Sequence, residues 1–377
     1  MIQFIQDIQQ DKLRMAFNND VVRFRLSQGV AAYCIVTMTE DVSVRLYPGP
    51  DGVFYFNFKP YIASIINTRN FEDNLQTQIQ STIANSFVYD FTDGVFLNLL
   101  VKIQAVRSDN TTDIGEYSLR WIAGVEQLRE YSELSINYML LLTPLSKQTN
   151  NHAYLKYWQG YPFDFGMYNH VEEGVNISNK TNLLSQEFYT PGTITRLFFS
   201  DGRTDETIED VLPLVEGVNQ LEIDPHSDKH FYLSVEKVAY RCGVYIKWLN
   251  KYGAYNYWLF ENTAAIDRTT KQLGELFNDN ENFENSFGRS IQIGKESQDV
   301  IKVITEALTE AESKIVEGII DSPKIYLFTG QPFSRNSYRD WIEVSLKTTS
   351  SRIKNYKQNL NNMAFDFELP QRYTQTL

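Results

Sequence analysis

One cluster of residues in this sequence has the types and spacing of a metal site. Asp224, His226, Asp228 and His230 alternate along the chain, so an extended backbone would place all four side chains on one face of a strand. Carboxylate and imidazole groups together are common ligands of divalent metals. Pro225 and the polar residues around it favour a solvated surface turn instead. We therefore expect this chain to bind no metal ion and no other cofactor.

A second stretch resembles a phosphate-binding loop, but only in part. Five residues separate Gly288 from Gly294, whereas a P-loop has four between its glycines. Glu296 then stands between the lysine and Ser297, and an acidic side chain there would repel a phosphate group. Ser297 is better interpreted as the cap of a following helix.

Catalytic groups cannot be nominated from this sequence. The 47 acidic residues make chance carboxylate pairs unavoidable, and none stands out as the acid and base of a glycan hydrolase. The four histidines include none with a serine and an acid placed as in a nucleophilic triad. We therefore expect that the protein is not an enzyme, and a glycan hydrolase is the least favoured of the functions considered.

Composition narrows the range of partners. The chain has 377 residues and a formal net charge of -12, which argues against a broad electrostatic grip on nucleic acid. This charge is compatible with contact that does not hold DNA, as in a DNA conduit. The first residues show no secretory signal, and the apolar runs are far shorter than the ~20 residues that span a bilayer, so we expect no membrane contact. Cys34 and Cys242 are predicted to be small buried residues.

Residues 241–261 contain the clearest structural element. Two runs of alternating side chains flank a turn that contains Asn250 and Gly253, which predicts a β-hairpin. Aromatic side chains occur on both of its faces, so we expect the hairpin either to lie between two layers of the same chain or to be covered on one side by a partner. The residues that we predict as packing or oligomer contacts are Trp248, Tyr255, Tyr257, Trp258 and Phe260.

The rest of the chain reads as mainly β. Short runs rich in Val, Ile and aromatic residues recur between Gly, Pro and Asn turns, which is typical of β-sandwich domains of the Ig-like kind. Phe54, Phe56 and Phe58 alternate and are predicted to fill a core. We expect one β-sandwich domain over residues 1–135 and a second over 136–238.

A third domain, of α+β type, is expected over residues 239–377. It would contain the aromatic hairpin and one long helix over residues 296–320, with Ser297 as its cap and Pro323 just after its end. The helix is predicted from apolar residues that recur every three or four positions, namely Val300, Ile301, Val303, Ile304, Leu308, Ile315 and Ile319.

Four stretches resemble a known group of proteins. They are LKYWQGYPFDFGMY (155–168), CGVYIKWLNKYGAYNYWLF (242–260), the closing block FDFELPQRYTQTL, and LYPGPDGVFYFNFKPYIASIIN near the start. Together they resemble structural proteins encoded in the virion gene blocks of tailed bacteriophages that infect Bacteroidetes, crAss-like phages among them. The resemblance implies a neck, ring or tail component that assembles as a homo-oligomeric ring, and it implies no active-site residue.

We therefore expect a structural protein that is made in the host cytoplasm and incorporated into the virion. Its expected partners are copies of itself in a ring and the neighbouring neck or tail proteins. The polar segments 70–85 and 278–288 are candidates for arms that reach those neighbours. The alternative is a carbohydrate-binding adhesion module of a phage tail or cell surface, in which sugars stack on aromatic rings. The rings named for that role are Trp158, Tyr161, Trp248, Tyr255 and Trp258.

Overall fold

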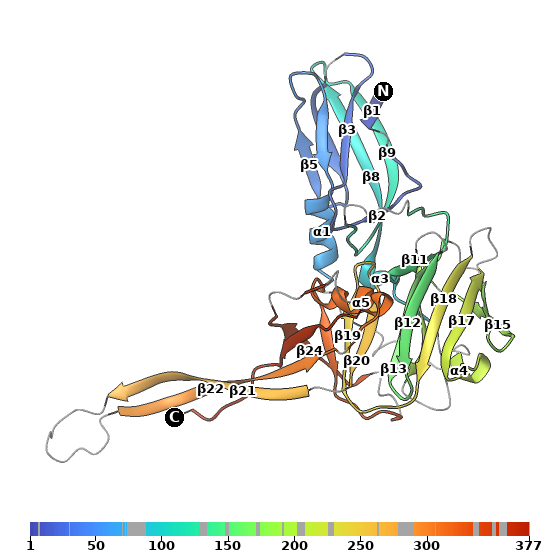
Figure 1. Cartoon of the computed structure of the whole chain (residues 1–377). Helices are drawn as coiled ribbons and strands as arrows, with labels where there is room; N and C mark the ends of the chain where they lie inside the picture. Colours follow the sequence, from blue (N-terminus) through green and yellow to red (C-terminus); the bar gives the residue numbers. More distant parts are fainter. Residues whose placement is uncertain are drawn as a thin grey trace. The chain divides into compact units, whose positions relative to one another are not determined.

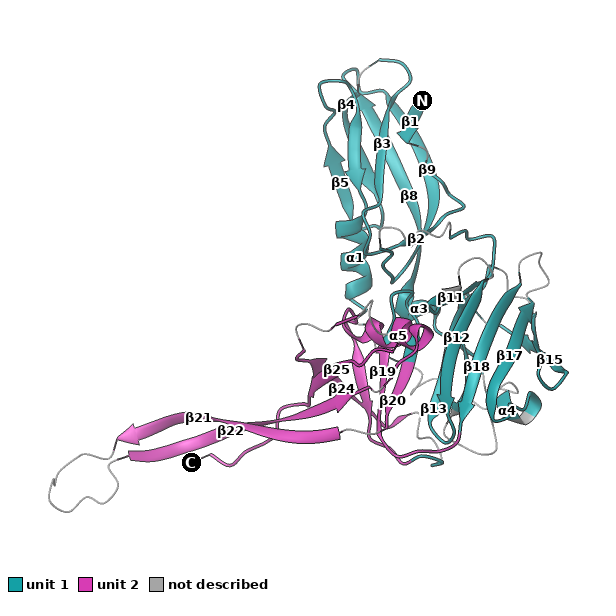
Figure 2. Cartoon of the chain, viewed as in Figure 1, with its two compact units in different colours: residues 1–238, 249–256, 332–338 teal, residues 239–248, 257–331, 339–377 magenta. Residues whose placement is uncertain are grey.

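The structure is a computed structural model, and it confirms that the chain is mainly β, with several sheets and few helical residues (Figure 1). The chain forms two compact units (Figure 2). Unit 1 comprises Met1–Val238, Leu249–Asn256 and Pro332–Tyr338, and unit 2 comprises Ala239–Trp248, Tyr257–Gln331 and Arg339–Leu377. The structure describes residues 1–6, 8–29, 31–69, 71, 73, 88–127, 134–147, 151–170, 174–190, 192–201, 208–224, 230–261, 264–277, 290–305, 307–334, 339–348, 352–353 and 360–376.

The first part of unit 1 is a β-sandwich. One sheet has the order β1-β3-β6, and the facing sheet has the order β2-β9-β8-β4-β5. Between the sheets, Phe58, which directly follows β6, packs on Trp121 of β9 with ring centroids 5.6 Å apart. The strands are β1 (Ile2–Gln6), β2 (Leu13–Met15), β3 (Val21–Leu26), β4 (Ala31–Thr37), β5 (Ser43–Leu46), β6 (Phe54–Asn57), β8 (Phe96–Arg107) and β9 (Thr112–Ile122).

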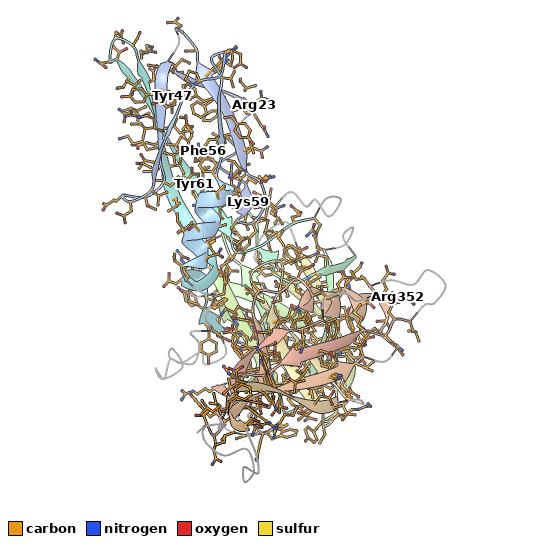
Figure 3. The ribbon with its side chains drawn as sticks, turned by 90° about the vertical axis from the view of Figure 1, so that its left-hand side faces the viewer. Arg23, Tyr47, Phe56, Lys59, Tyr61 and Arg352 are labelled. Atoms are coloured by element: carbon orange, nitrogen blue, oxygen red, sulfur yellow. The ribbon has the colours of Figure 1, made fainter. Side chains whose placement is uncertain are left out.

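The predicted core residues of this sandwich are confirmed. Phe54, Phe56 and Phe58 are all buried: alternate side chains of β6 place Phe54 and Phe56 on the same face, and Phe58 directly follows the strand. Helix α1 (Lys59–Asn67) follows directly, with a proline in its first turn. Tyr61 of this helix stacks on Phe56, with ring centroids 5.4 Å apart (Figure 3). The helix thus covers the open end of the core.

The second part of unit 1 also contains two sheets. Their strand orders are β10-β13-β16-β7 and β11-β12-β18-β17-β14-β15. Tyr157, Phe163 and Phe199 stack in series between these strands, with centroid distances of 5.3 and 5.9 Å. The elements are β7 (Val88–Asp90), α3 (Thr92–Val95), β10 (Leu140–Leu141), β11 (Leu145–Lys147), β12 (His152–Trp158), β13 (Pro162–Tyr168), β14 (Gly174–Asn179), β15 (Leu184–Tyr189), β16 (Ile194–Asp201), α4 (Ile208–Val211), β17 (Gly217–Asp224) and β18 (Phe231–Val238).

Unit 2 is built on a seven-stranded sheet with the order β20-β19-β23-β24-β25-β22-β21. Its elements are β19 (Val244–Leu249), β20 (Tyr255–Phe260), β21 (Ala264–Phe277), β22 (Ser290–Ile304), α5 (Glu310–Val316), η2 (Glu317–Ile319), β23 (Ile325–Phe328), β24 (Trp341–Leu346) and β25 (Ala364–Glu368). The predicted hairpin is confirmed as β19 and β20. Its turn closes with a hydrogen bond from the Asn250 amide to the Ala254 carbonyl at 2.7 Å, and Gly253 supplies the positive φ that the turn needs.

The predicted long helix over residues 296–320 is wrong. Residues 296–304 belong to β22, and among the described residues of the segment the only helix with α geometry is α5. The apolar residues Val300 and Ile301 are β-branched, which favours strand backbone, and β22 pairs with strands on both sides at this point. Ser297 is therefore a strand residue, whereas Thr309 caps α5 through a capping box with Glu312.

The two cysteines were both predicted to be buried. Cys34 is buried as predicted, and burial raises the pKa of its thiol to about 12. The expectation for Cys242 is wrong, because this residue is exposed on the segment before β19, where its sulfur lies 3.1 Å from the Tyr240 hydroxyl. Among the described residues, no helix has both the length and the apolar character needed to cross a bilayer. The expected division into three domains stays a prediction.

Candidate assembly surfaces

The aromatic residues of the hairpin are internal. Each of the five predicted contact residues is at most 5% exposed, namely Trp248, Tyr255, Tyr257, Trp258 and Phe260. In unit 2, the Tyr257 ring stacks on Tyr245 at 5.9 Å, and Phe260 packs on Phe365 at the same centroid distance. These rings hold the chain's own strands together. A role in contacts with a second copy stays a prediction.

The rings named for sugar stacking are equally covered. Trp158 is 1% exposed and Tyr161 is 3% exposed, and the other three belong to the buried hairpin. A sugar stacks on the open face of a ring, and none of these five rings has one. No observation therefore favours the carbohydrate-binding alternative over assembly.

The candidate metal ligands are only partly within the described residues. Asp224 and His230 are described, whereas His226 and Asp228 lie outside the described residues. The Nδ1 atom of His230 lies 3.3 Å from a carboxylate oxygen of Glu222, and a hydrogen bond from Lys180 lowers the pKa of that carboxyl group. The described part of the chain contains no group of three or more potential ligands placed to hold a metal ion.

The most deeply buried charges of unit 1 form an arginine cluster. Arg196 on β16 is 1% exposed, and its Nε and Nη2 atoms donate to the two carboxylate oxygens of Asp164 on β13 at 3.0 and 2.5 Å. Its Nη1 atom donates to Asp73 at 2.9 Å. The guanidinium carbon also lies 4.7 Å from the centroid of the Tyr255 ring. Because each of these charges is already paired with an opposite charge, the cluster stabilises the packing of unit 1.

The same cluster fixes the start of the first predicted arm. Of segment 70–85, only Phe71 and Asp73 are within the described residues. Asp73 is bound by Arg196, and the Phe71 carbonyl accepts a hydrogen bond from the Tyr255 hydroxyl at 3.3 Å. Both described residues of this segment are therefore tied to the core of unit 1. The second predicted arm, 278–288, lies outside the described residues.

The strands on either side of that second segment form the most exposed element of unit 2. β21 has 14 residues and β22 has 15, and together they form a two-stranded antiparallel ribbon that we call the arm. Figure 2 shows the arm extending away from the rest of unit 2. Every residue of β21 except Gly274 is exposed. Large apolar side chains are exposed along the arm, namely Ile266, Leu273, Leu276, Phe277 and Ile291, with Phe277 at 78%.

The two edges of the arm differ. On the β22 side, the C-terminal residues 369–376 run alongside the strand: the Arg372 amide donates to the Ser297 carbonyl at 3.4 Å, and Gly294 forms a bridge with Thr376. On the β21 side, the sheet ends, and no other described strand is its neighbour. The arm therefore presents one free edge and two exposed faces.

An ionic clamp holds the C-terminal residues on the arm. Asp299 of β22 accepts hydrogen bonds from Arg268 of β21 at 2.7 Å and from Arg372 at 2.8 Å. The hydrogen bond from Arg268 is the main cause that lowers the pKa of Asp299 to about 2, and Arg372 adds to it. A lowered pKa means that the clamp is intact above the ordinary value of 3.8 and is lost as the pH falls toward 2.

Asp299→Asn is expected to release the C-terminal residues at neutral pH. The amide keeps the size of the side chain but removes the charge that both arginines share. Trypsin should then cleave after Arg372 several-fold faster, which mass spectrometry of the digest measures. Asp267→Asn is the matched control, because it removes only the neighbouring pair with Lys302. Equal cleavage rates in the two variants would contradict the clamp.

Comparison with known proteins adds little. No family model matches the chain, and no curated protein matches it. The solved structure described as "Anomalous substructure of Titin-A168169" is 8% identical over 63% of this chain and 98% of that chain, with a TM-score of 0.27. A tetra-tandem repeat in the extending region of a large adhesion protein is 8% identical over 82% of this chain and 58% of that chain, with a TM-score of 0.24. At these TM-scores the likeness carries no argument.

Proposed function

We propose that this protein is a structural component that works by assembling with copies of itself. The observation that carries the proposal is the arm, a long ribbon of two strands with exposed apolar side chains. An isolated two-stranded hairpin is at best marginally stable in water. Contact with a second copy would cover the arm and stabilise it.

The size of the arm suits this role. A standard protein interface takes ~20–30 residues from each partner. β21 supplies 14 residues, and residues 290–298 of β22, none of them buried, extend this surface into the size range of such an interface. The contact would be formed by strand edges and apolar side chains, which are the means by which β-proteins join.

We place this assembly in the neck or tail region of a tailed-phage virion, as a homo-oligomeric ring in contact with neighbouring neck or tail proteins. The support is the resemblance of the four sequence stretches to virion proteins of phages of Bacteroidetes, and the net charge of -12, which suits a surface that DNA passes without being held. We keep the Ig-like assignment of the sandwiches, and the absence of a catalytic role, as parts of the same proposal.

Imaging of the purified full-length chain by negative stain, together with its mass by light scattering, tests this function. We expect closed rings of uniform size and a mass that is a multiple of 43.8 kDa. A chain that remains a 43.8 kDa monomer at every concentration tested would overturn the proposal.

A further inference from the structure

A second strand edge of this protein has the properties of a docking site. β15 ends the six-stranded sheet of unit 1, and among the described strands only β14 pairs with it (Figure 1). The register between the two strands is regular from Gly174 opposite Tyr189 to Asn179 opposite Leu184, without a bulge. The outer backbone groups of β15 are therefore arranged to pair with one more strand.

Apart from β21, the other sheet edges of the described chain are protected against such pairing. β2, β5, β6, β7 and β10 have two to four residues each, and β1 and β11 have irregular registers. β20 is six residues long, but all six are buried. Short, bulged or covered edges are the usual ways in which proteins prevent unwanted strand addition. β15 has none of these protections, and its only charged residue is Glu187.

The side chains beside this edge are also those of a contact surface. Leu183 is 86% exposed, Leu184 is 44% exposed and Tyr189 is 52% exposed. Leu183 has a φ of +63°, in the left-handed region that is unfavourable for a non-glycine residue. A leucine that is both strained and exposed is unfavourable in an isolated chain. A partner that covered it would recover the burial of its side chain.

β21 of another copy matches this edge in length and character. The register of β21 is regular from Ala264 to Gln272 before it bulges at Gly274, so it offers a straight segment longer than the six residues of β15. Ile266 lies within this segment and Leu273 just beyond it, and both are exposed. Apolar side chains therefore lie near both ends of each edge.

We propose that β15 of one copy pairs with β21 of the next, so that each arm extends the six-stranded sheet of its neighbour. This inference rests on the proposed function and names the contact by which copies join. Because β15 and β21 are different surfaces, the contact is head-to-tail, and repeated contacts of this kind generate a ring if the rotation closes. The outer part of the arm, including Leu276 and Phe277, then lies against the neighbouring copy.

Disulfide cross-linking between two differently labelled copies tests the contact. In a Cys242→Ser background, copies that carry Gln186→Cys are mixed with copies that carry Thr269→Cys, Thr270→Cys or Lys271→Cys and are mildly oxidised. Three consecutive arm positions cover both faces of β21. We expect a disulfide between the two kinds of copy in at least one mixture. Cys34 does not interfere, because it is buried.

The matched control is Tyr232→Cys, on β18 of the same sheet. Tyr232 is 40% exposed, but it pairs with His152 of β12 on one side and with Glu222 of β17 on the other, so β18 offers no edge there. It is expected not to cross-link to the arm. Cross-links only between two Gln186→Cys copies, or none to the arm in a protein that is oligomeric, would overturn the inference.

A variant that carries a charge on the β15 edge distinguishes failure of this inference from failure of the proposed function. Gln186→Lys places a cation on β15, as natural edges do, and is expected to weaken self-association about tenfold or more. Tyr232→Lys adds the same charge at a position that is paired on both sides, and it is expected to change the self-association little. If the unmodified chain is monomeric, the proposed function fails. If it is oligomeric and Gln186→Lys leaves the association unchanged, only the β15 contact fails.

Discussion

Shortening the arm is expected to convert the assembled protein into a folded monomer. Thr269 and Gln298 face each other in the ribbon, so residues 270–297 can be replaced by an Asn-Gly turn that closes a shorter hairpin. The clamp between Arg268 and Asp299 stays in place. Because the removed segment contains most of the exposed apolar residues of the arm, the dissociation constant should rise on the order of 100-fold or more.

Light scattering at a concentration where the full chain is assembled measures this change, and circular dichroism checks that the β structure is retained. A milder pair of variants provides the control. Phe277→Ser changes a side chain of the arm that is 78% exposed. Tyr47→Ser changes a side chain that is 69% exposed and directly follows β5 in the first β-sandwich of unit 1. Only the first is expected to weaken assembly. Rings that persist after the arm is shortened would show that copies join elsewhere.

Replacing the buried arginine is expected to have the largest effect on stability. Arg196→Met removes the partner of Asp164, which is 1% exposed and would be left as an unpaired charge in the core. Breaking a buried pair in this way costs about 3–5 kcal/mol. Asp73 would lose its contact with Arg196 as well. Urea unfolding followed by circular dichroism measures the loss in the free energy of unfolding.

The double variant Arg196→Met with Asp164→Leu is the control for this effect. It removes both charges, and replacement of a buried pair by apolar residues is often close to neutral. It should therefore be more stable than Arg196→Met alone. If Arg196→Met alone lowered the free energy of unfolding by less than about 1 kcal/mol, water would have to reach Asp164, and the arginine cluster would not be a major source of stability in unit 1.

Short-range patterns predicted the local elements of this fold well. The hairpin of β19 and β20 follows from two alternating runs around a turn that contains asparagine and glycine, and these features lie within one short segment. The alternation of Phe54, Phe56 and Phe58 likewise predicted a buried face. In both cases the side-chain period of a strand determines which residues are covered.

The helix prediction failed because apolar spacing alone was used to choose between helix and strand. Val300, Ile301 and Val303 fit a helical period, but they also form the buried end of β22, where Lys302 and Ile304 are exposed between and beyond them. The density of β-branched residues was the signal for a strand. The sequence Thr309 to Glu312 was a readable capping box for a shorter helix.

The surfaces now proposed for assembly could not be found from the sequence. The free edge of β21 and the regular edge of β15 are properties of strand order, which depends on pairing between distant residues. The Arg196 cluster likewise joins residues from three separate parts of unit 1. The five aromatic residues predicted as contacts were singled out by their alternation in the hairpin, and that alternation reflects burial within the chain because all five are core residues.

Hydrogen exchange of the backbone amides of β21 tests the central claim most directly. The full chain is compared at a concentration where copies associate and after dilution to monomers. We predict that amides in Ala264–Phe277 exchange more slowly in the associated state, because a second copy covers this strand and its free edge. Association that leaves the exchange of β21 unchanged would contradict the claim that the arm joins one copy to the next.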